Sequence, residues 1–320
     1  MARTIRNEFY KNLSYLKLME AHLKARKGKG YRKEIILFNL KQEEYIMWLY
    51  ESLRNKTYKH GGYTSFYVYE PKLRKIEKSR YIDRIVHRWV VDNFLEPYFV
   101  PTFINTSFAC LKNKGMHKSA LYVQDTMKHL KRIWNNYYIL KMDVRKYFDS
   151  INKNILVAIL KRKIKDKDLM WLINEILFAN KREVGLEIGN YTSQMFANIY
   201  LNEIDFYIKN KLKVKYYCRY LDDSVLMVRT KEEAKYLLEK IKTFLKDNLE
   251  LELNEKIQIF KSSQGVNFCG YKINEYRLKI RDKGKRKLKK KIKELKYKIK
   301  IGEISSKESK KILMWPFRVY

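Results

Sequence analysis

The order of apolar and polar residues predicts helices and one strand in the first hundred positions. Residues 1–60 are basic and carry apolar residues at helical intervals, which predicts a helical segment. The stretch "TSFYVYE" (64–70) alternates as a strand does and stops at Pro71. The apolar run at 83–99 predicts an amphipathic helix that is interrupted at Pro97.

The following part of the chain alternates predicted strands with predicted helices. Strands are predicted at 137–144, 214–220, 224–230, 256–260 and 266–273, and helices at 120–134, 151–164, 167–180, 192–212 and 231–249. The helix that begins near residue 192 has Thr192 or Ser193 as its expected N-cap. The two strands that flank "LDD" (221–223) predict a tight hairpin with acidic residues at its turn.

The composition changes near the C-terminal end. Residues 281–300 contain twelve Lys or Arg residues and two acidic residues. Four apolar residues of this run still fall on one helical stripe, namely Leu288, Ile292, Leu295 and Ile299. A fully solvated charge run would have no such stripe, so we predict a basic helix with one edge that faces the core.

Charge gives the first indication of function. The 320 residues include 70 Lys and Arg against 35 Asp and Glu, a net charge of +35 at pH 7. This excess indicates a polyanionic partner, and nucleic acid is the first candidate. The alternative is a basic surface that only reflects lysine-rich coding. A hydrophobic content of 46% with 14% aromatic residues argues against disorder.

Other compositional features argue against several protein classes. Cys110, Cys218 and Cys269 form no C-x-x-C pair, so neither a zinc ribbon nor a disulfide framework is expected, and reduced thiols fit a cytoplasmic protein. The five histidines do not occur at metal-ligand spacing. The chain begins without an apolar signal region, and no apolar run reaches the roughly 18 residues that a membrane span needs.

The acidic residues at two predicted strand ends are the main candidates for chemistry. Asp222 and Asp223 are adjacent between apolar runs, and Asp143 follows another apolar strand. Ionised carboxylates are costly to bury without positive charge beside them, and Mg²⁺ prefers carboxylate and phosphate oxygens as ligands. A divalent-cation site is therefore one interpretation. The alternative is that these aspartates pair with nearby cationic side chains, namely Lys141, Arg145 and Arg219.

Several motifs occur in the order that is known from one enzyme family. "YLDD" (220–223) resembles the Y-x-D-D signature of reverse transcriptases, and further motifs match the family in order: "LRKIEKSRYIDRIVHRWV" (73–90), "SFACLKNKGMHKSAL" (107–121), "KMDVRKYFDSI" (141–151), "IGNYTSQMFANIYL" (188–201), "LNEK" (253–256) and "FCGY" (268–271). The resemblance covers roughly residues 65–275. A lone YLDD is weak support, whereas an ordered set of motifs is specific.

The resemblance implies an α+β right-hand polymerase fold and an RNA-directed DNA polymerase activity. It implies a basic helical extension at 1–60, fingers at 61–136, a palm at 137–275 with fingers helices near 152–185, and a short basic helical thumb at 276–320. The implied partners are template RNA, a primer or cDNA strand, and dNTPs. The protein is expected in the cytoplasm, encoded by a bacterium or a phage, with no membrane association.

The resemblance also implies a role for each matching residue. Asp143, Asp222 and Asp223 would hold two Mg²⁺ ions, with Mn²⁺ as an alternative ion, and Lys256 matches the palm lysine that is proposed to protonate pyrophosphate. Lysine is common in this chain, so a solvated Lys256 is the alternative. The implied dNTP-binding residues are Lys72, Arg74, Arg84, Phe148, Ile188, Gly189 and Gln194.

Two of these nucleotide-binding assignments have structural alternatives, and two further sets of residues would contact nucleic acid. Phe148 matches the steric gate that favours dNTPs over rNTPs, but it could be a core residue, and Arg84 could be structural. Phe268, Gly270 and Tyr271 would form the primer grip. The basic residues expected to follow the backbone of an RNA–DNA hybrid are Lys285, Arg286, Lys289, Lys290 and Lys293.

One departure from the family pattern predicts a subclass. Many reverse transcriptases have Gln before the glycine at position 189 and Pro after Ser193, where this chain has Ile188 and Gln194. This form resembles reverse transcriptases of diversity-generating retroelements, which copy a template-repeat RNA and misincorporate opposite adenine. An aliphatic Ile188 cannot make polar contacts to the nucleotide, which is a physical reason for weaker checking, although Ile188 could simply pack the palm.

The subclass has alternatives and an implied partner. A retron, group II intron-like or phage-defence reverse transcriptase would share the same motifs. The short stretch after residue 275 favours the retroelement, because it leaves no room for an intron-type DNA-binding or endonuclease domain. Retroelement enzymes of this kind work with a small, basic, oligomeric accessory protein. A non-catalytic RNA-binding protein on a polymerase fold is disfavoured, because all three aspartates are present.

Overall fold

The computed structural model describes residues 4–69, 73–306 and 308–309. The chain divides into two compact units. Unit 1 comprises Met1–Ile104, Val144–Lys211 and Ile241–Leu253, and unit 2 comprises Asn105–Asp143, Leu212–Lys240 and Asn254–Tyr320. The chain therefore passes between the units several times, so neither unit is one continuous stretch of sequence. The predicted division into fingers, palm and thumb stays a prediction.

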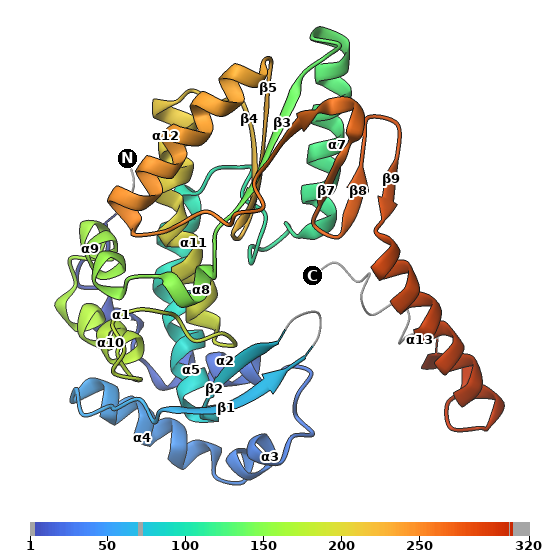
Figure 1. The fold of residues 1–320 in the computed structure, drawn as a ribbon. Helices are drawn as coiled ribbons and strands as arrows, with labels where there is room; N and C mark the ends of the chain where they lie inside the picture. The colour runs from blue at the N-terminus through green and yellow to red at the C-terminus, as the bar shows by residue number, and fades with distance from the viewer. Residues whose placement is uncertain (1–3, 70–72, 307, 310–320) are drawn as a thin grey trace. The chain divides into compact units, whose positions relative to one another are not determined.

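Unit 1 is mainly helical, and its described residues include one antiparallel hairpin of strands (Figure 1). Its α-helices are α1 (Phe9–Asn12), α2 (Tyr15–Arg26), α3 (Lys33–Leu40), α4 (Gln42–Arg54), α5 (Tyr81–Val90), α6 (Glu96–Phe99), α8 (Tyr147–Ser150), α9 (Lys153–Lys163), α10 (Lys167–Leu177) and α11 (Tyr191–Phe206). Shorter helical turns are the π-helices η1 (Val91–Leu95) and η3 (Tyr207–Lys211) and the 3₁₀ turn η2 (Val100–Thr102). The antiparallel hairpin consists of β1 (Tyr63–Val68) and β2 (Arg74–Ser79).

Two predicted helix boundaries in unit 1 are wrong. The helical run over 81–99 is not interrupted at Pro97, because η1 precedes it and Pro97 lies in the first turn of α6, where proline is tolerated. The helix predicted from residue 192 begins at Tyr191, and its N-cap is Asn190. Thr192 lies inside the first turn of α11, and its hydroxyl is 3.1 Å from Nδ1 of His87.

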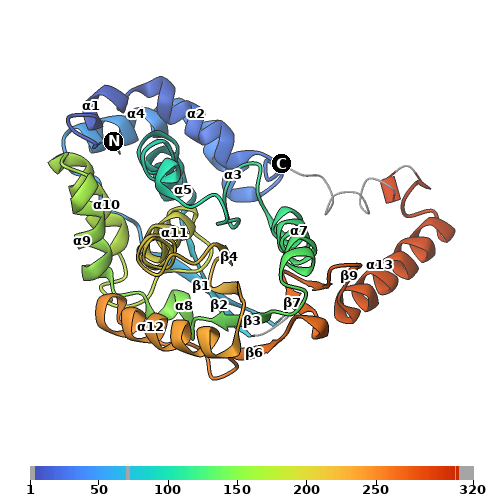
Figure 2. The ribbon, with the colours of Figure 1, turned by 90° about the horizontal axis from the view of Figure 1, so that it is seen from above.

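The core of unit 1 forms around α5 and α11, which lie side by side (Figure 2). Trp89 of α5 is fully buried, and its indole N–H donates to the carbonyl of Asn12 at 3.0 Å. Tyr200 of α11 is also fully buried, and its hydroxyl donates to the carbonyl of Leu249 at 2.7 Å. These large side chains are buried with their polar atoms paired, as burial requires.

Unit 2 contains two antiparallel sheets. Its elements are α7 (Met116–Ile133), β3 (Tyr138–Asp143), β4 (Tyr216–Tyr220), β5 (Asp223–Val228), β6 (Gln258–Lys261), the 3₁₀ turn η4 (Ser262–Gln264), β7 (Val266–Phe268), β8 (Tyr271–Ile273), β9 (Leu278–Ile280) and α13 (Asp282–Lys300). The strand order is β4-β5-β3-β6 in the larger sheet and β7-β8-β9 in the smaller one. Helix α12 (Lys231–Leu249) belongs to unit 2 up to Lys240 and to unit 1 after it.

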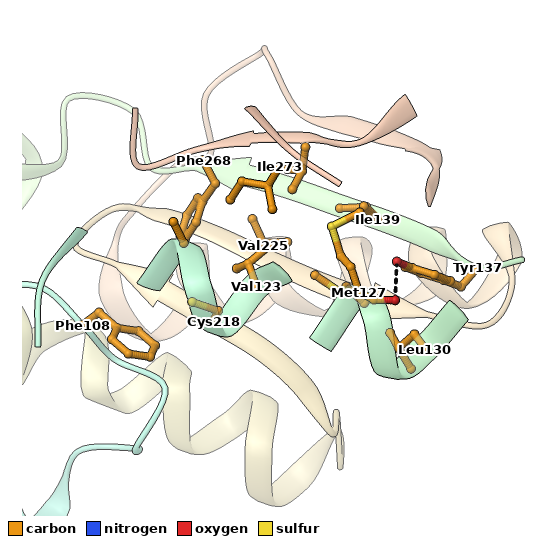
Figure 3. Packing of buried hydrophobic residues seen from close by; sticks show 13 residues of the cluster. Phe108, Val123, Met127, Leu130, Tyr137, Ile139, Cys218, Val225, Phe268 and Ile273 are labelled. Atoms are coloured by element: carbon orange, nitrogen blue, oxygen red, sulfur yellow. Dashed lines mark hydrogen bonds between the residues drawn. The ribbon is translucent and has the colours of Figure 1, made fainter. Parts of the chain in front are cut away.

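Helix α7 supplies much of the core of unit 2. Its apolar face, including Val123 and Met127, packs with Val225 of the larger sheet and Phe268 of the smaller sheet (Figure 3). At the end of this cluster the hydroxyl of Tyr137 donates to the carbonyl of Met127 at 3.4 Å. This packing fixes the larger sheet, so the turn between β4 and β5 projects from a rigid base.

The sequence therefore predicted most elements correctly, including the mixed α and antiparallel β content. Within the part of the chain that the structure describes, no helix is long and apolar enough to cross a membrane.

Candidate active site

The turn between β4 and β5 carries the acidic pair. The hairpin predicted around "LDD" is confirmed: β4 ends at Tyr220, β5 begins at Asp223, and these two residues are register partners. Leu221 in the turn has a φ of 53°, a left-handed conformation that is unfavourable for a bulky side chain. Its carbonyl accepts from the Arg219 guanidinium at 3.1 Å. Strain that is held in place by neighbouring contacts is typical of functional turns.

The sheet register brings two of the three aspartates together. Asp143 at the end of β3 is directly opposite Asp223 at the start of β5. Side chains that are directly opposite in an antiparallel pair are close, and two like charges there destabilise the sheet. A cation is therefore expected near this pair, from the protein or from a ligand.

Lys141 supplies part of this positive charge. It lies two residues before Asp143 on the same strand, and therefore on the same face of the sheet. Its ammonium is 3.7 Å from Oδ1 of Asp223, an ion pair that is too long for a hydrogen bond. The alternative interpretation from the sequence, in which Lys141 pairs with the aspartates, is confirmed for Asp223.

The other two cations of that alternative, Arg145 and Arg219, each have a further partner. The Arg145 guanidinium lies 3.4 Å from a carboxylate oxygen of Glu252. Arg219 donates to the carbonyl of Leu221. Lys141 therefore forms an ion pair with Asp223 of the acidic pair.

Asp223 remains only partly compensated. Burial raises the pKa of its carboxyl group to about 7, the charges of Asp143 and Asp222 raise it as well, and only Lys141 opposes this shift. Its Oδ1 is buried and has no hydrogen-bond partner among the described residues. A buried carboxylate oxygen without a donor, beside other carboxylates, is the kind of ligand that a divalent cation takes.

The protein alone does not form a complete metal cage. Within residues 4–69, 73–306 and 308–309, no group of three or more His, Cys, Asp or Glu side chains is arranged to hold a metal ion. Asp143 and Asp223 fit a cation that also takes oxygen ligands from substrate phosphates, as Mg²⁺ commonly does. The predicted three-aspartate site with two ions stays a prediction.

Asn254 is a residue at this site that the sequence did not reveal. Its backbone N–H donates to the carbonyl of Asp143 at 2.7 Å, and its side-chain amide donates to Oδ2 of Asp143 at 3.3 Å. These two bonds fix the end of β3 and orient its carboxylate. The signal for Asn254 was its place in "LNEK" (253–256), two residues before Lys256. Lys256 itself is exposed, which leaves both its catalytic and its solvated interpretations open.

The predicted nucleotide-binding cations lie in different surroundings. Arg74 is exposed on β2, where a phosphate can reach it. The guanidinium of Arg84 lies 2.8 Å from a carboxylate oxygen of Glu34 and over the ring of Tyr81, which favours the structural role for Arg84. Lys72 lies outside the described residues.

Phe148 and its neighbour Tyr147 differ in how deeply their side chains are buried. Tyr147 is buried, and its hydroxyl donates to the carbonyl of Ala197. Phe148 is only half-buried, and the two rings meet edge to face with centroids 5.7 Å apart. The core position of the pair is thus filled by Tyr147, which leaves Phe148 available for the predicted gate.

Ile188 and Gly189 lie in the loop between α10 and α11, here called the α10–α11 loop (residues 178–190). Ile188 is half-buried, and its carbonyl accepts from the backbone N–H of Glu77 in β2 at 3.1 Å. Gly189 has a φ of 119°, and a Cβ there would lie 3.0 Å from Cγ2 of Ile76. Only glycine fits that position comfortably. Gln194 is exposed in the first turn of α11.

The predicted primer grip contains one buried and two accessible residues. Phe268 is buried in the core of unit 2, so it anchors the hairpin and does not face solvent. Cys269 and Gly270 form the β7–β8 turn with φ of 47° and 81°, the conformation of a tight hairpin turn. A Cβ at Gly270 would meet no atom within 4 Å, so a strand of nucleic acid can approach this backbone. The Tyr271 hydroxyl contacts Nδ1 of His117.

The basic C-terminal helix has the predicted amphipathic form. Leu295 is buried, Leu288, Ile292 and Ile299 are half-buried, and the five predicted nucleic-acid-binding residues are all exposed. Beside the start of α13 lies a cavity of about 550 Å³. Its lining is strongly basic and includes Lys272, Arg277, Lys279, Arg281 and Lys285. The positive charge of unit 2 is therefore concentrated around this cavity and α13.

Comparison with known proteins identifies the class to which this fold and site belong. Residues 68–273, about two thirds of the chain, match the family described as reverse transcriptase (RNA-dependent DNA polymerase). The chain belongs to this family, as its ordered motifs predict.

The chain is also similar in sequence to individual proteins. The chain is 24% identical to the group II intron-encoded protein LtrA of Lactococcus lactis subsp. cremoris, over 72% of this chain and 50% of LtrA. It is 25% identical to the protein YkfC of Escherichia coli K12, over 64% of this chain and 65% of YkfC. The chain thus spans half to two thirds of the length of these relatives.

A solved structure shows the same fold. Apo telomerase from Candida tropicalis aligns with a TM-score of 0.53 at 14% identity, over 69% of this chain and 49% of that one. The likeness confirms the predicted polymerase fold.

Proposed function

We propose that the protein is an RNA-directed DNA polymerase that extends a primer along an RNA template. The observation that carries this proposal is the pairing of Asp143 with Asp223 at adjacent strand ends, with an unbonded carboxylate oxygen between like charges. Membership in the reverse transcriptase family supports it independently.

Asp143, Asp222 and Asp223 would hold the Mg²⁺ ions. Such ions lower the pKa of a primer hydroxyl and neutralise the triphosphate when they are bound. The protein's own contribution is to hold the carboxylates ready. Asn254 orients Asp143 through two hydrogen bonds, and Lys141 limits the repulsion at Asp223.

The residues of unit 1 would select the nucleotide. Arg74 is exposed and can contact the triphosphate through its guanidinium, which suits phosphate oxygens. Phe148 is half-buried beside Tyr147 and would crowd a ribose 2′-hydroxyl. Ile188, Gly189 and Gln194 would lie near the nascent base pair.

The basic residues of α13 and the cavity beside it would bind the phosphates of the template and primer. Lys285 belongs to both the helix and the cavity lining. Each phosphate that Lys or Arg neutralises releases a counterion, so binding by this surface should weaken steeply with salt.

The test of polymerase activity is the double variant Asp222→Ala/Asp223→Ala. Primer extension on an RNA template should be abolished, while binding of the same primer–template should persist, because the basic surface is unchanged. Extension that survives in the double variant would refute the proposal. Loss of both extension and binding would indicate misfolding, and far-UV circular dichroism checks this.

We further propose that the enzyme serves a diversity-generating retroelement and misincorporates opposite template adenines. Ile188 and Gln194 support this, because they occupy the positions where the family pattern differs from Gln and Pro. The template would then be a template-repeat RNA, and a small basic oligomeric accessory protein would be the partner. A cytoplasmic location is part of the same proposal.

The alternative is a group II intron-like enzyme, which the similarity to LtrA favours. Ile188→Gln separates the two. In a retroelement enzyme the error frequency opposite adenine should fall in sequenced cDNA, while errors opposite the other bases change little. An unchanged frequency would contradict the role of Ile188. A template and variable repeat pair beside the gene, differing at adenines, would support the retroelement independently.

A further inference from the structure

The α10–α11 loop joins the segments that carry the predicted nucleotide-binding residues. On one side its backbone pairs with the segment that starts at Phe148: the N–H of Leu186 donates to the carbonyl of Phe148 at 2.7 Å, and the N–H of Gly185 donates to the carbonyl of Ile151 at 2.8 Å. The loop therefore sets where the backbone of Phe148 lies.

On its other side the loop pairs with β2, the strand that begins with Arg74. The backbone N–H of Glu77 donates to the carbonyl of Ile188, and the Asn190 amide donates to the carbonyl of Glu77 at 3.2 Å. Gly189 packs against Ile76 with no room for a side chain. Ile188 and Gly189 are thus held between the segment of Phe148 and the strand of Arg74.

A series of ion pairs with alternating charges connects the same segments. The Lys75 ammonium lies 3.3 Å from Glu77, and Glu77 also pairs with Arg182. Arg182 then lies 3.9 Å from Glu187, whose carboxylate is 3.3 Å from the Lys153 ammonium. The charges alternate from β2 to the α10–α11 loop and on to α9.

The last pair of this series, Lys153 and Glu187, is buried. The side chains of Lys153 and Glu187 are 0% and 3% exposed. Lys153 also donates to Oδ1 of Asn180 at 2.9 Å and to the carbonyl of Leu177, and the Asn180 amide contacts Glu187. Burial lowers the pKa of Lys153 and raises that of Glu187, but each charge has its partner in place. Glu187 directly precedes Ile188, so this anchor fixes the loop at the residue beside the predicted base-pair contact.

We propose that Arg182 and Glu187 are positioning residues for nucleotide selection, because their ion pairs fix Ile188 and Gly189 between Phe148 and the strand of Arg74. The proposal rests on the proposed polymerase function and extends it. If the ion pairs were only structural, their loss would lower the stability of the protein but would not change its selection among nucleotides. Selectivity is therefore the property to measure.

Arg182→Gln is the test variant, because Arg182 is 46% exposed and its loss leaves Lys153 and Glu187 paired. Arg162→Gln is the matched control. Arg162 is an exposed arginine of unit 1 that pairs at 2.6 Å with Glu203, a residue of α11 and not of the loop. Both variants remove one positive charge, so they change nonspecific binding of nucleic acid to a similar extent.

Single-nucleotide incorporation on a primed RNA template gives the first readout. Arg182→Gln should raise KM for the dNTP about fivefold, change kcat less than about twofold, and lower the preference for dNTP over rNTP about threefold or more. Arg182→Lys should recover part of this loss, and Arg162→Gln should resemble the wild type. Equal kinetics for the two Gln variants would overturn the proposal, as would a fall in kcat and melting temperature without a change in selectivity.

Hydrogen exchange gives a second readout that does not depend on activity. The amides of Glu77 and Leu186 donate to Ile188 and Phe148, one bond on each side of the loop, and they should exchange faster in Arg182→Gln than in Arg162→Gln. Unchanged exchange would overturn the claim that the ion pairs hold the loop. If the wild-type enzyme extends no primer, the polymerase function fails, whereas the exchange data still decide how the loop is held.

Discussion

Glu187 in unit 1 and Asp223 in unit 2 are two carboxylates whose charges are balanced in opposite ways. Glu187 in unit 1 is 3% exposed and pairs with Lys153 inside a network of donors. Asp223 in unit 2 has one distant cation, Lys141, an unbonded oxygen, and a carboxylate opposite it across the sheet. Burial raises the pKa of both acids, but only Glu187 has its charge balanced within the fold.

The difference separates stability from function. A balanced buried pair fixes structure, and removing one partner leaves an uncompensated charge. An unbalanced cluster destabilises the fold unless a ligand binds, so its persistence indicates a binding role. The comparison is consistent with the proposed roles, chemistry for Asp143 and Asp223 and positioning for Glu187.

The largest effect is expected from Asp223→Asn. Primer extension should fall by about a thousandfold or more, because a cation ligand is lost. Without Mg²⁺ the variant should nevertheless melt at a higher temperature, by roughly 1 kcal/mol of added stability, because the repulsion across the sheet is removed. Asp125→Asn, an exposed change in α7 of the same unit, is the control. If Asp223→Asn melted at a lower temperature than Asp125→Asn, the contrast drawn between Asp223 and Glu187 would be wrong.

The opposite result is expected at the balanced pair. Lys153→Met leaves buried Glu187 without its nearer cation, and unfolding in urea should show a loss of about 3–5 kcal/mol. The double change Lys153→Met/Glu187→Leu should recover most of this loss, because two apolar side chains replace the pair. A single variant that is as stable as the wild type would show that the charge of Glu187 is balanced in some other way.

A smaller effect is expected from His87, which is buried. Its ring nitrogens lie 3.1 Å from Nε2 of His60 and from the hydroxyl of Thr192, and burial lowers its pKa to about 3. Because the unfolded chain titrates near 6.5, it binds the proton first, so stability should fall as the pH drops from about 6.5 toward 3.

His87→Gln is the variant that checks this dependence, with urea unfolding measured at pH 7 and pH 5. The loss of stability between these values should be smaller in the variant than in the wild type. An equal loss would mean that other groups, such as the carboxylates, account for the acid sensitivity of unit 1.

Most helices and strands could be predicted from local sequence patterns. The apolar runs of β3 and β5 and the acidic turn between them were readable, because hairpins depend on neighbouring residues. The register that places Asp143 opposite Asp223 could not be derived, since it pairs positions eighty residues apart. The pattern predicts Thr192 or Ser193 as the helix cap, but the Thr192 hydroxyl contacts His87 on another helix.

The candidate site shows the same limit. The family motifs indicated the aspartates and Phe148, because those residue types recur at fixed spacing. Asn254 and the partner of Glu187 were not readable, since their roles depend on contacts between distant segments. Lys153 resembles any other lysine in a chain that has many, and only burial distinguishes it.

The order of strands in the larger sheet has a consequence for synthesis of the protein. Strand β3 leaves the ribosome first, yet both of its neighbours, β5 and β6, are encoded much later. A nascent chain that has reached residue 212 therefore carries the strand of Asp143 with neither edge paired. Unpaired apolar edges invite aggregation, and pairing over such sequence distances is slow. Translation speed and chaperones that bind the growing chain should therefore affect the yield of active enzyme.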